Sequence, residues 1–508
     1  MAGTNSEATL ARVLQTTRAG EELYHSFFDI SSTSDTLPTP SEASTIRSHI
    51  DAIDSDLLCL DTELLRINSG VKSDSADAIR NKAYEARARL MSIISPLRRI
   101  PPELLAYIFK LSSDGFLLAE GQSLWPICGV SRRWRCVALS DATLWSNIYH
   151  SGSEPEDFDE HTSYRLNLCM QRSAQAPLSV VWWHEAMPLP PVVAAESSRF
   201  RALSGYRGAF APLRKGSMPM LEYLEIREDE DELRDPAAVT DVFADAPRLR
   251  EICIRQCQCA SIQLPFLQIQ KSMLCFISPH HMREFLLRLP GLLELKFVYQ
   301  TSSPYPHLAP VHLSNLAVLD ISDPGQILEC LYLPNLTELR VRPRVQDGMW
   351  PRLISLVVRS ACKLQKMSLE SVSASQISQL LAVAPFLESL ELKCRRVHTL
   401  LPCLATCTAN AQLLAPRLKV LQFSIHDRYD TEEPISALLD CLESRFAHCD
   451  TDVTVVATTG AQLSSVMPLQ RVKIIHLHRL DYPPFPPNST RLSRLQRLIS
   501  KYGLEADY

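Results

Sequence analysis

The sequence of 508 residues predicts a multidomain protein in which helices come first and an α/β repeat solenoid with a curved parallel sheet follows. Three observations favour this fold: a seven-residue periodicity of apolar residues near the N-terminus, a short tryptophan-rich helical segment, and a leucine motif repeated over the rest of the chain. They divide the chain into five parts: a flexible segment (1–40), a helical or coiled-coil segment (41–95), a small helical domain (96–150), the solenoid (160–490) and a C-terminal tail (491–508).

Composition and charge exclude several functional classes. Hydrophobic residues make up 46% of the chain and charged residues 21%, which is enough material for a folded core. The net charge is −5, without the concentrated basic excess of a protein that binds nucleic acid. No apolar run is long enough to cross a bilayer, and the N-terminus has no secretion signal. We therefore expect a cytoplasmic and/or nuclear protein whose partners include neither nucleic acid nor membrane.

Catalytic, cofactor-binding and metal-binding motifs are missing from the sequence. Phosphate-binding glycine loops and the G-x-S-x-G nucleophile motif do not occur, and His184-Glu185 lacks the second histidine that a zinc protease needs one turn later. The fifteen cysteines include no C-x-x-C pair, and the tightest cluster is Cys253, Cys257 and Cys259. We interpret the cysteines as free thiols in a reducing compartment, and we expect no enzyme, no cofactor and no metal.

The N-terminal 95 residues predict a flexible start and then two helices. Residues 1–40 are rich in Ser and Thr, so we expect them to be mostly flexible, with at most a short helix around residues 7–29. A second pattern, from about 75 to 94, is rich in Ala and Arg and also helical. The helix expected between residue 40 and residue 75 carries an apolar seam whose gaps alternate between four and three residues: Ile46, Ile50, Ile53, Leu57, Leu60, Leu64 and Ile67. The seam indicates either a coiled coil that self-associates through residues 46–67 or a helical hairpin packed on itself.

The next 50 residues predict a small helical domain. Pro101 and Pro102 suit the first turn of a helix, where a missing N–H costs nothing, and Glu103 suits its positive end. Apolar residues then recur at helical spacing: Leu104, Leu105, Ile108, Phe109 and Leu111. A second helix is expected from Ser123, with Trp125, Ile127, Val130, Trp134 and Val137. Leu144 and Trp145 close the segment.

These residues resemble the F-box motif. The places of that motif are filled by Ile100-Pro101-Pro102-Glu103-Leu104-Leu105, Ile108-Phe109, Val130-Ser131-Arg132-Arg133-Trp134 and Leu144-Trp145, with a longer loop at residues 114–122. The order of helical seam, F-box and leucine-rich tail is similar to the large F-box families of mushroom-forming fungi. The resemblance implies a three-helix domain that docks on a Skp-family adaptor, and through it on the cullin and RING subunits of a ubiquitin ligase. The adaptor-binding residues that it implies are Pro96, Leu97, Ile100, Pro101, Pro102, Glu103, Leu104, Leu105, Ile108, Phe109, Val130, Trp134, Leu144 and Trp145. The alternative is that this apolar stripe is internal core.

A P-x-L-x-x-L-x-apolar motif recurs through the rest of the chain. Its copies are Pro219–Ile226, Pro247–Ile254, Pro290–Phe297, Pro334–Val341, Pro385–Leu392 and Pro416–Phe423, and two further copies, Leu316–Ile321 and Leu364–Leu369, lack the proline. From Leu292 onward the leading leucines are separated by 24, 20, 28, 23 and 31 residues, which is mainly the spacing of leucine-rich repeats. We expect a strand at each L-x-L, and helices at Met282–Leu289, Ser375–Ala384 and Ile435–Phe446, stacked into a solenoid. The first strand is expected at Leu178–Trp182 and the last at Arg471–Leu477. An unrelated α/β domain is the alternative.

Residues between the repeat leucines should line one face of the sheet, because neighbouring residues of a strand point to opposite faces. They are Glu225, Cys253, Lys296, Asp320, Arg340, Ser368, Glu391 and Gln422, and all except Cys253 are our candidates for binding a protein substrate. The acidic run Glu228–Asp235 is interpreted as a solvated loop, with binding of a basic partner as the alternative. The whole pattern predicts a non-catalytic substrate receptor of a ubiquitin ligase. The alternative is an interaction scaffold with a degenerate F-box.

Overall fold

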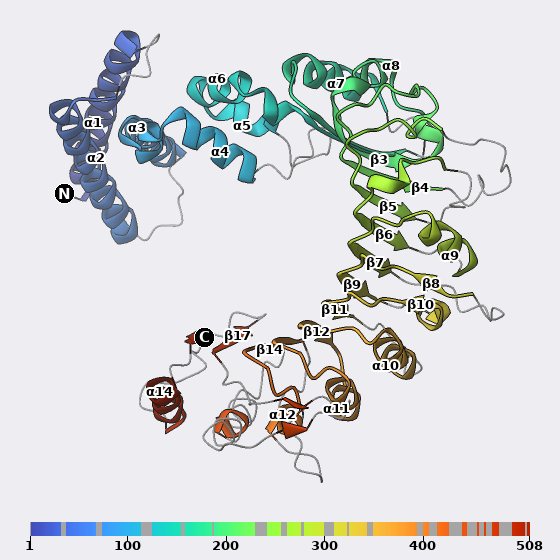
Figure 1. Ribbon diagram of the computed structural model, residues 1–508. Coiled ribbons are helices and arrows are strands. Elements are labelled where there is room, and N and C mark those ends of the chain that lie inside the picture. Colours follow the sequence, from blue (N-terminus) through green and yellow to red (C-terminus); the bar gives the residue numbers. More distant parts are fainter. Residues whose placement is uncertain are drawn as a thin grey trace. The chain divides into compact units, whose positions relative to one another are not determined.

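A computed structural model of the chain divides into two compact units, which are drawn in Figure 1. The first unit holds Met1–Gly115 and Glu120–Leu144, and the second holds Phe116–Ala119 and Trp145–Tyr508. The structure describes residues 2–31, 37–67, 74–112, 124–152, 154, 158–184, 187–228, 241–255, 262–275, 279–298, 309–322, 325–342, 349–393, 400–405, 414–425, 439–443, 455–456, 462–463, 470–476, 490–502 and 505–507.

The first unit begins with three long helices that share one core. They are α1 (Ala2–Ser31), α2 (Pro40–Ile67) and α3 (Asp74–Ile94). At the start of α2, the Glu42 carboxylate accepts a hydrogen bond from the Thr39 backbone N–H (2.7 Å), and the Thr39 hydroxyl accepts one from the Glu42 N–H (3.3 Å). This reciprocal cap satisfies two backbone donors that the helix leaves open. The shared core consists of Val13 from α1, Ile46, Ile50, Ile53, Leu57 and Leu60 from α2, and Ala83, Ala86, Leu90 and Ile93 from α3.

The structure corrects the predictions for this region in two respects. Residues 1–40 are not mostly flexible, since α1 spans 30 residues and packs Leu10, Val13, Leu23 and Phe27 on the shared core. The seam from Ile46 to Leu60 is buried inside a three-helix bundle of one chain rather than in a two-helix hairpin, and self-association through residues 46–67 stays a prediction. The side chains of Leu64 and Ile67 lie outside the described residues. The prediction of flexibility was based on the Ser and Thr content of residues 1–40 and gave too little weight to the apolar residues that recur along α1.

The rest of the first unit is a group of short helices. They are η1 (Pro96–Arg99), α4 (Pro102–Ser112), α5 (Leu124–Val130), α6 (Arg132–Ser140) and η2 (Ala142–Trp145), the last of which ends in the second unit. The second helix expected from Ser123 is in fact two helices. Ser131 between them is extended (φ −158°), and its hydroxyl accepts a hydrogen bond from the Trp134 N–H at 3.1 Å, which makes it the N-cap of α6.

The second unit is built on a parallel sheet of 14 strands, in the order β1-β2-β3-β4-β5-β6-β7-β9-β11-β12-β13-β14-β17-β18. The strands are β1 (Asn147–Gly152), β2 (Leu178–His184), β3 (Phe200–Tyr206), β4 (Tyr223–Arg227), β5 (Glu251–Arg255), β6 (Lys271–Cys275), β7 (Glu294–Val298), β9 (Val318–Ile321), β11 (Glu338–Val341), β12 (Lys366–Glu370), β13 (Ser389–Lys393), β14 (Val420–Ile425), β17 (Arg471–His476) and β18 (Glu505–Asp507). Two small ladders stand apart: β8 (Val311–His312) with β10 (Leu331–Tyr332), and β15 (Val455–Val456) with β16 (Gln462–Leu463).

Helices connect several of these strands. They are α7 (Glu160–Arg172), α8 (Pro191–Ala194), α9 (Pro279–Leu287), α10 (Met349–Ser360), α11 (Ala374–Ala382), α12 (Leu401–Ala405) and α14 (Thr490–Tyr502). Figure 1 shows α9, α10 and α11 on the same side of the strand stack. The repeat leucines are buried, as Leu224 and Leu390 illustrate, because each L-x-L strand turns them into the core. The predicted solenoid is therefore present.

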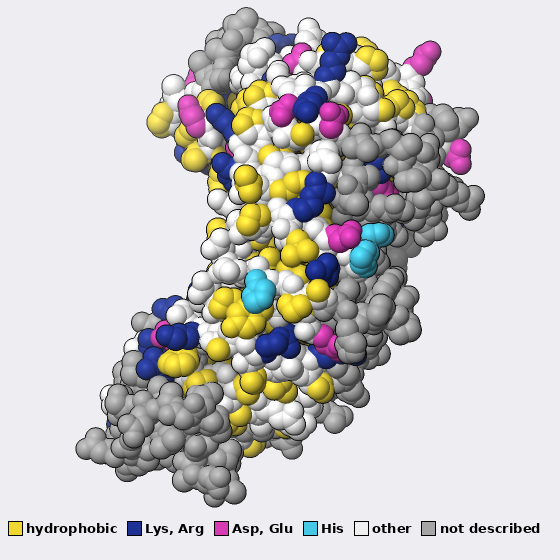
Figure 2. Space-filling view, turned by 45° about the vertical axis from the view of Figure 1, so that its right-hand side comes forward, with side chains coloured by type: hydrophobic (Ala, Val, Ile, Leu, Met, Phe, Trp, Pro, Cys, Tyr) yellow, Lys and Arg dark blue, Asp and Glu magenta, His cyan; other side chains and the backbone are white. Residues whose placement is uncertain are grey.

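The solenoid is longer than predicted at both ends. The sheet begins with β1 at Asn147, inside the segment assigned to the small helical domain, and the supposed tail 491–508 holds most of α14 and all of β18, which pairs with β17. Of the helix expected at Ile435–Phe446, residues 439–443 are described and are helical. Among the described residues, no helix is both long and apolar enough to cross a bilayer. On the face drawn in Figure 2, hydrophobic, basic and acidic side chains intermix.

Candidate functional site

Helix α4 carries apolar side chains on two of its faces, and only one of these faces packs against the rest of the chain. Leu105 and Phe109 are buried. Four other large side chains are exposed: Leu104 (56%), Tyr107 (59%), Ile108 (41%) and Leu111 (69%). Their spacing of three, four and seven residues from Leu104 places them on one helix face, which we call the α4 stripe. A helix with this spacing of exposed apolar side chains suits insertion into a hydrophobic groove of a partner.

Helix α6 fixes the turn that leads into α4. The Arg133 guanidinium donates hydrogen bonds to the backbone carbonyls of Leu97 (3.3 Å), Arg98 (2.8 Å) and Ile100. The Trp134 ring packs against the Phe109 ring, with centroids 5.1 Å apart. A charged donor on three carbonyls is a strong tie. Together the two side chains hold η1, the Ile100-Pro101 turn and α4 in one arrangement.

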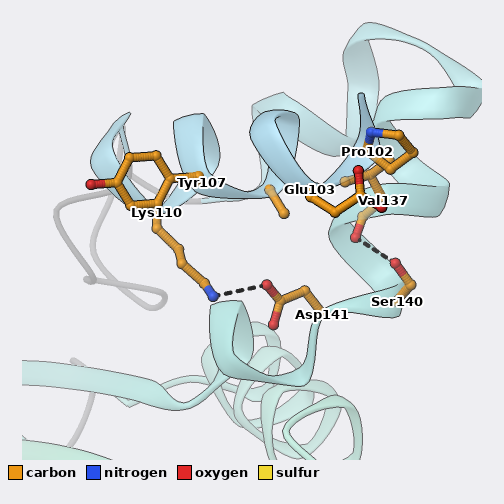
Figure 3. A pocket seen from close by; sticks show the side chains of 8 residues that line it. Pro102, Glu103, Tyr107, Lys110, Val137, Ser140 and Asp141 are labelled. Atoms are coloured by element: carbon orange, nitrogen blue, oxygen red, sulfur yellow. Dashed lines mark hydrogen bonds and ion pairs between the residues drawn. The ribbon is translucent and has the colours of Figure 1, made fainter. Parts of the chain in front are cut away.

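A pocket of about 450 Å³ lies between α4 and the end of α6 (Figure 3). Its lining is Pro102, Glu103, Ala106, Tyr107 and Lys110 from α4, with Val137, Ser140 and Asp141. The Lys110 ammonium is 3.0 Å from the Asp141 carboxylate. Burial raises the pKa of Asp141, but hydrogen bonds from Thr143 and Lys110 outweigh burial and hold this pKa below its ordinary value. The ion pair therefore persists at neutral pH and ties the C-terminal turn of α4 to Asp141.

The predicted adaptor-binding residues separate into accessible and inaccessible groups. The exposed ones are Pro96, Leu97, Pro101, Pro102, Glu103, Leu104, Ile108 and Val130, and the half-exposed ones are Ile100 and Trp134. The other four, Leu105, Phe109, Leu144 and Trp145, are buried, so their assignment to an adaptor surface is wrong. Trp145 belongs to the second unit, where the Arg172 guanidinium lies 4.4 Å from its ring centroid. Tyr107 and Leu111 are missing from the predicted set, although their helical spacing from Leu104 was a usable signal.

The predicted substrate-binding residues come together in one row of the sheet, which we call the ladder row. Neighbouring strands pair them in the order Glu225, Cys253, Met273, Lys296, Asp320, Arg340, Ser368, Glu391, Gln422. All seven candidates lie in this row. Met273 was missed because β6 has Ser272 where the repeat motif has a leucine. The row continues through Ser204 before Glu225 and through Lys473 and Asp507 after Gln422.

Most charges of the ladder row are already paired within the sheet. Glu225 accepts hydrogen bonds from Arg255 Nε (2.6 Å), the Tyr223 hydroxyl (3.0 Å) and Cys253 Sγ (3.6 Å). Asp320 is buried beside Arg342, with an N–O distance of 2.6 Å. Cys253 is buried too. Asp320 is therefore a structural ion-pair member, and its assignment as an accessible substrate contact is wrong.

The other half of the row shows the same pairing. Arg340 contacts the carboxylates of Glu338 (2.6 Å) and Glu294 (3.6 Å). Glu391 accepts from the Ser368 hydroxyl (2.6 Å), the Lys393 ammonium (2.9 Å) and the Gln422 amide (3.0 Å). Burial raises the pKa of Glu391, yet the bonds from Ser368 and Lys393 outweigh it and the net pKa is lowered. Of the candidates, Lys296 makes no ion pair with a described residue.

The described part of the chain offers no metal centre, since it contains no group of three or more His, Cys, Asp or Glu side chains that could hold an ion. Nine described cysteines are free thiols. Burial raises the pKa of Cys169 to about 12 and those of Cys330 and Cys362 to about 11, so these thiols stay protonated at neutral pH. Cys257 and Cys259 lie outside the described residues, and the absence of zinc there stays a prediction.

The F-box-like family matches residues 97–151, from η1 into β1. A comparison with curated proteins gives no match. Among solved structures, the TLR13–ssRNA13 complex is similar over 58% of this chain at 16% identity, with a TM-score of 0.32, and the chain spans 42% of its length. The leucine-rich repeat-containing protein LegL7 from Legionella pneumophila is similar over 62% of this chain and 97% of its own, at 13% identity and a TM-score of 0.31.

Two classes of module are thus joined in one chain, a helical domain that presents an apolar stripe and a solenoid of leucine repeats. Residues 97–151 form an F-box-like domain. The solenoid rests on its own evidence, which is the buried repeat leucines and the parallel register of the sheet.

Proposed function

We propose that the chain is the substrate-recognition subunit of a Skp–cullin–F-box type ubiquitin ligase. The F-box-like domain docks on a Skp-family adaptor, which connects it to the cullin and RING subunits, and the solenoid recruits a protein substrate. The chain is not an enzyme, because the other subunits carry out ubiquitin transfer. The proposed localisation is the cytoplasm and/or the nucleus.

The observation that carries this proposal is the α4 stripe within an F-box-like domain. Four large apolar side chains that are 41–69% exposed on one helix are unfavourable in water. Their burial in a partner groove gains roughly 25 cal/mol per Å² of apolar surface. Because Arg133 and Trp134 already fix the turn before α4, little ordering cost is added on binding.

A scaffold without ligase activity is the second candidate function. It is favoured by the burial of Leu105, Phe109, Leu144 and Trp145, which removes four residues from the expected adaptor surface. In that case the solenoid and the helical bundle bind partners, and the F-box-like domain is degenerate. The two candidates differ in adaptor binding.

The test is co-purification of the full chain with a Skp-family adaptor, in wild type and in a Leu104→Ala, Ile108→Ala double variant. We expect a stable one-to-one complex for the wild type and none for the variant, since central apolar anchors contribute about 2 kcal/mol or more each. The matched control is Leu58→Ala on α2, which removes a side chain that is 70% exposed and should keep full binding.

Thermal unfolding of the double variant separates loss of contact from loss of fold. Both side chains are exposed, so we expect a melting temperature close to that of the wild type. A wild-type chain that is folded but does not bind the adaptor would refute the ligase proposal and favour the scaffold. A variant that unfolds would show that Leu104 and Ile108 belong to the core.

A further inference from the structure

The turns that lead into β12, β13 and β14 gather positive charge at one end of the strands. They contribute Lys363, Lys366, Arg417 and Lys419, with Phe386 between them, and we call this group the basic edge. The group is contiguous because the three strands are parallel and in register, with Lys366 opposite Ser389 and Ser389 opposite Val420.

The basic edge is held in place by contacts on both sides of Phe386. The Lys363 ammonium is 5.9 Å and the Arg417 guanidinium 5.1 Å from the Phe386 ring centroid. Distances of this size allow cation–π attraction. Backbone bonds join the turns, from Glu388 N–H to the Gln365 carbonyl and from Lys419 N–H to the Glu388 carbonyl, both 2.8 Å. The backbone that carries these cations is therefore fixed before binding, so less conformational entropy is lost when a ligand binds.

The charge of this edge is not neutralised within the described part of the chain. Glu388 is the one carboxylate on these three turns, and it pairs with Lys419 at 3.0 Å. Lys363, Lys366 and Arg417 make no ion pair with any residue that the structure describes. Glu338, which is opposite Lys366 on β11, is bonded to Arg340. At the next strand, Arg471 stands opposite Glu505 in the register of β17 and β18.

The same edge carries balanced charges from β4 to β7. The turns into β4, β5, β6 and β7 carry three cations (Arg248, Arg250, Lys271) and three carboxylates (Glu222, Glu251, Glu294). The turns into β12–β14 thus carry a positive excess that the turns into β4–β7 lack, in a chain whose net charge is −5. A local field of this kind attracts and orients an anionic partner.

We propose that the basic edge binds an acidic segment, rich in Asp and Glu, of a partner protein. This inference rests on the proposed function, in which the partner is the substrate to be ubiquitinated. Carboxylates of an extended segment reach Lys363, Lys366 and Arg417 in succession along the edge, and its apolar atoms lie against Phe386. Arg and aromatic side chains on a fixed platform are typical of interaction hot spots.

The test measures binding of a fluorescent octaglutamate peptide to the full chain by anisotropy, without adaptor. We expect binding that weakens from an ionic strength of about 0.05 M to about 0.5 M. A Lys363→Gln, Arg417→Gln variant should bind about tenfold more weakly, as expected for the loss of two surface charge contacts. The matched control is Arg248→Gln, Arg250→Gln, which removes the same charge from the turn into β5, in the balanced β4–β7 part of the edge, and should bind like the wild type.

Three outcomes would overturn the proposal. They are no peptide binding at the lower ionic strength, equal weakening in both variant pairs, and displacement of the peptide by an oligo-thymidine of equal charge at lower concentration than by unlabelled peptide. The last outcome would assign the edge to nucleic acid. Failure of adaptor binding leaves the peptide result standing and removes only the role of the partner as a ligase substrate.

Discussion

At the scale of single residues, the repeat motif predicts which face of the sheet a side chain lies on but not which ion pair it forms. The motif places Glu225 and Asp320 between leucines, and both lie in the ladder row as predicted. Their ion-pair partners, Arg255 and Arg342, follow 30 and 22 residues later in the chain. Such pairs depend on which strands are neighbours and how they are registered, which the motif leaves open. The face was predictable, but not the accessibility of its members.

Glu391 provides a test of this pairing through pH. Its folded-state pKa is lowered, so its contribution to stability is present above the ordinary carboxyl pKa of 4.5 and is lost as the pH falls through the lower folded value. We expect Glu391→Gln to reduce the free energy of unfolding by about 0.5–1 kcal/mol at pH 7. The difference from wild type should shrink as the pH falls below 4.5. Urea unfolding over a pH series measures it.

The control for this measurement is Glu370→Gln on the neighbouring strand β12. Glu370 makes no ion pair with a described residue, so its variant should match the wild type within about 0.5 kcal/mol over the whole series. A Glu391→Gln variant with the same pH profile as Glu370→Gln would show that the bonds from Ser368 and Lys393 add nothing to stability.

At the scale of elements, periodicity predicted the helices but not their partners. The alternating gaps from Ile46 to Leu60 correctly indicated an apolar helix face. The same spacing suits a dimer, a hairpin or a three-helix bundle, because all three bury one stripe per helix. The choice depended on α1, whose apolar residues Leu10, Val13 and Leu23 are diluted by Ser, Thr and Ala. A similar limit applies to α4, where Leu105 and Leu104 differ only in which face meets the core.

Ile53→Ala distinguishes a bundle within one chain from association through the seam. Ile53 is buried between helices of the same chain, so we expect a loss of about 2–4 kcal/mol in stability and an unchanged molar mass. Light scattering after size-exclusion chromatography gives the mass, and urea unfolding gives the stability. Exposed Leu58, truncated to Ala, serves as the control with little change in either. A wild-type dimer that becomes a monomer on Ile53→Ala would contradict the bundle.

At the scale of the whole molecule, the repeat motif predicted the solenoid and missed its ends. Strands β1 and β18 carry Asn-Ile-Tyr-His-Ser-Gly and Glu-Ala-Asp, neither of which matches the motif. End strands pair on one side, so their sequences depart from the interior repeats. The boundary predicted at residue 150 falls after the start of β1 at Asn147, because β1 does not match the repeat motif and lies inside the F-box-like match. Each unit nevertheless has its own core, formed by α1–α3 in one case and by the repeat leucines in the other.

Separate cores predict that the sheet can be destabilised without loss of adaptor binding. Leu390 is fully buried at the centre of β13, so Leu390→Ala should cost about 2–5 kcal/mol in the second unit. At a temperature where only the variant's sheet is unfolded, we expect the adaptor affinity of the variant to equal that of the wild type, because the α4 stripe lies in the other unit. Circular dichroism follows the sheet, and calorimetric titration with the adaptor follows the stripe. Loss of adaptor binding together with the sheet would show that the F-box-like domain depends on the solenoid for its fold, and the two modules would then act as one cooperative unit.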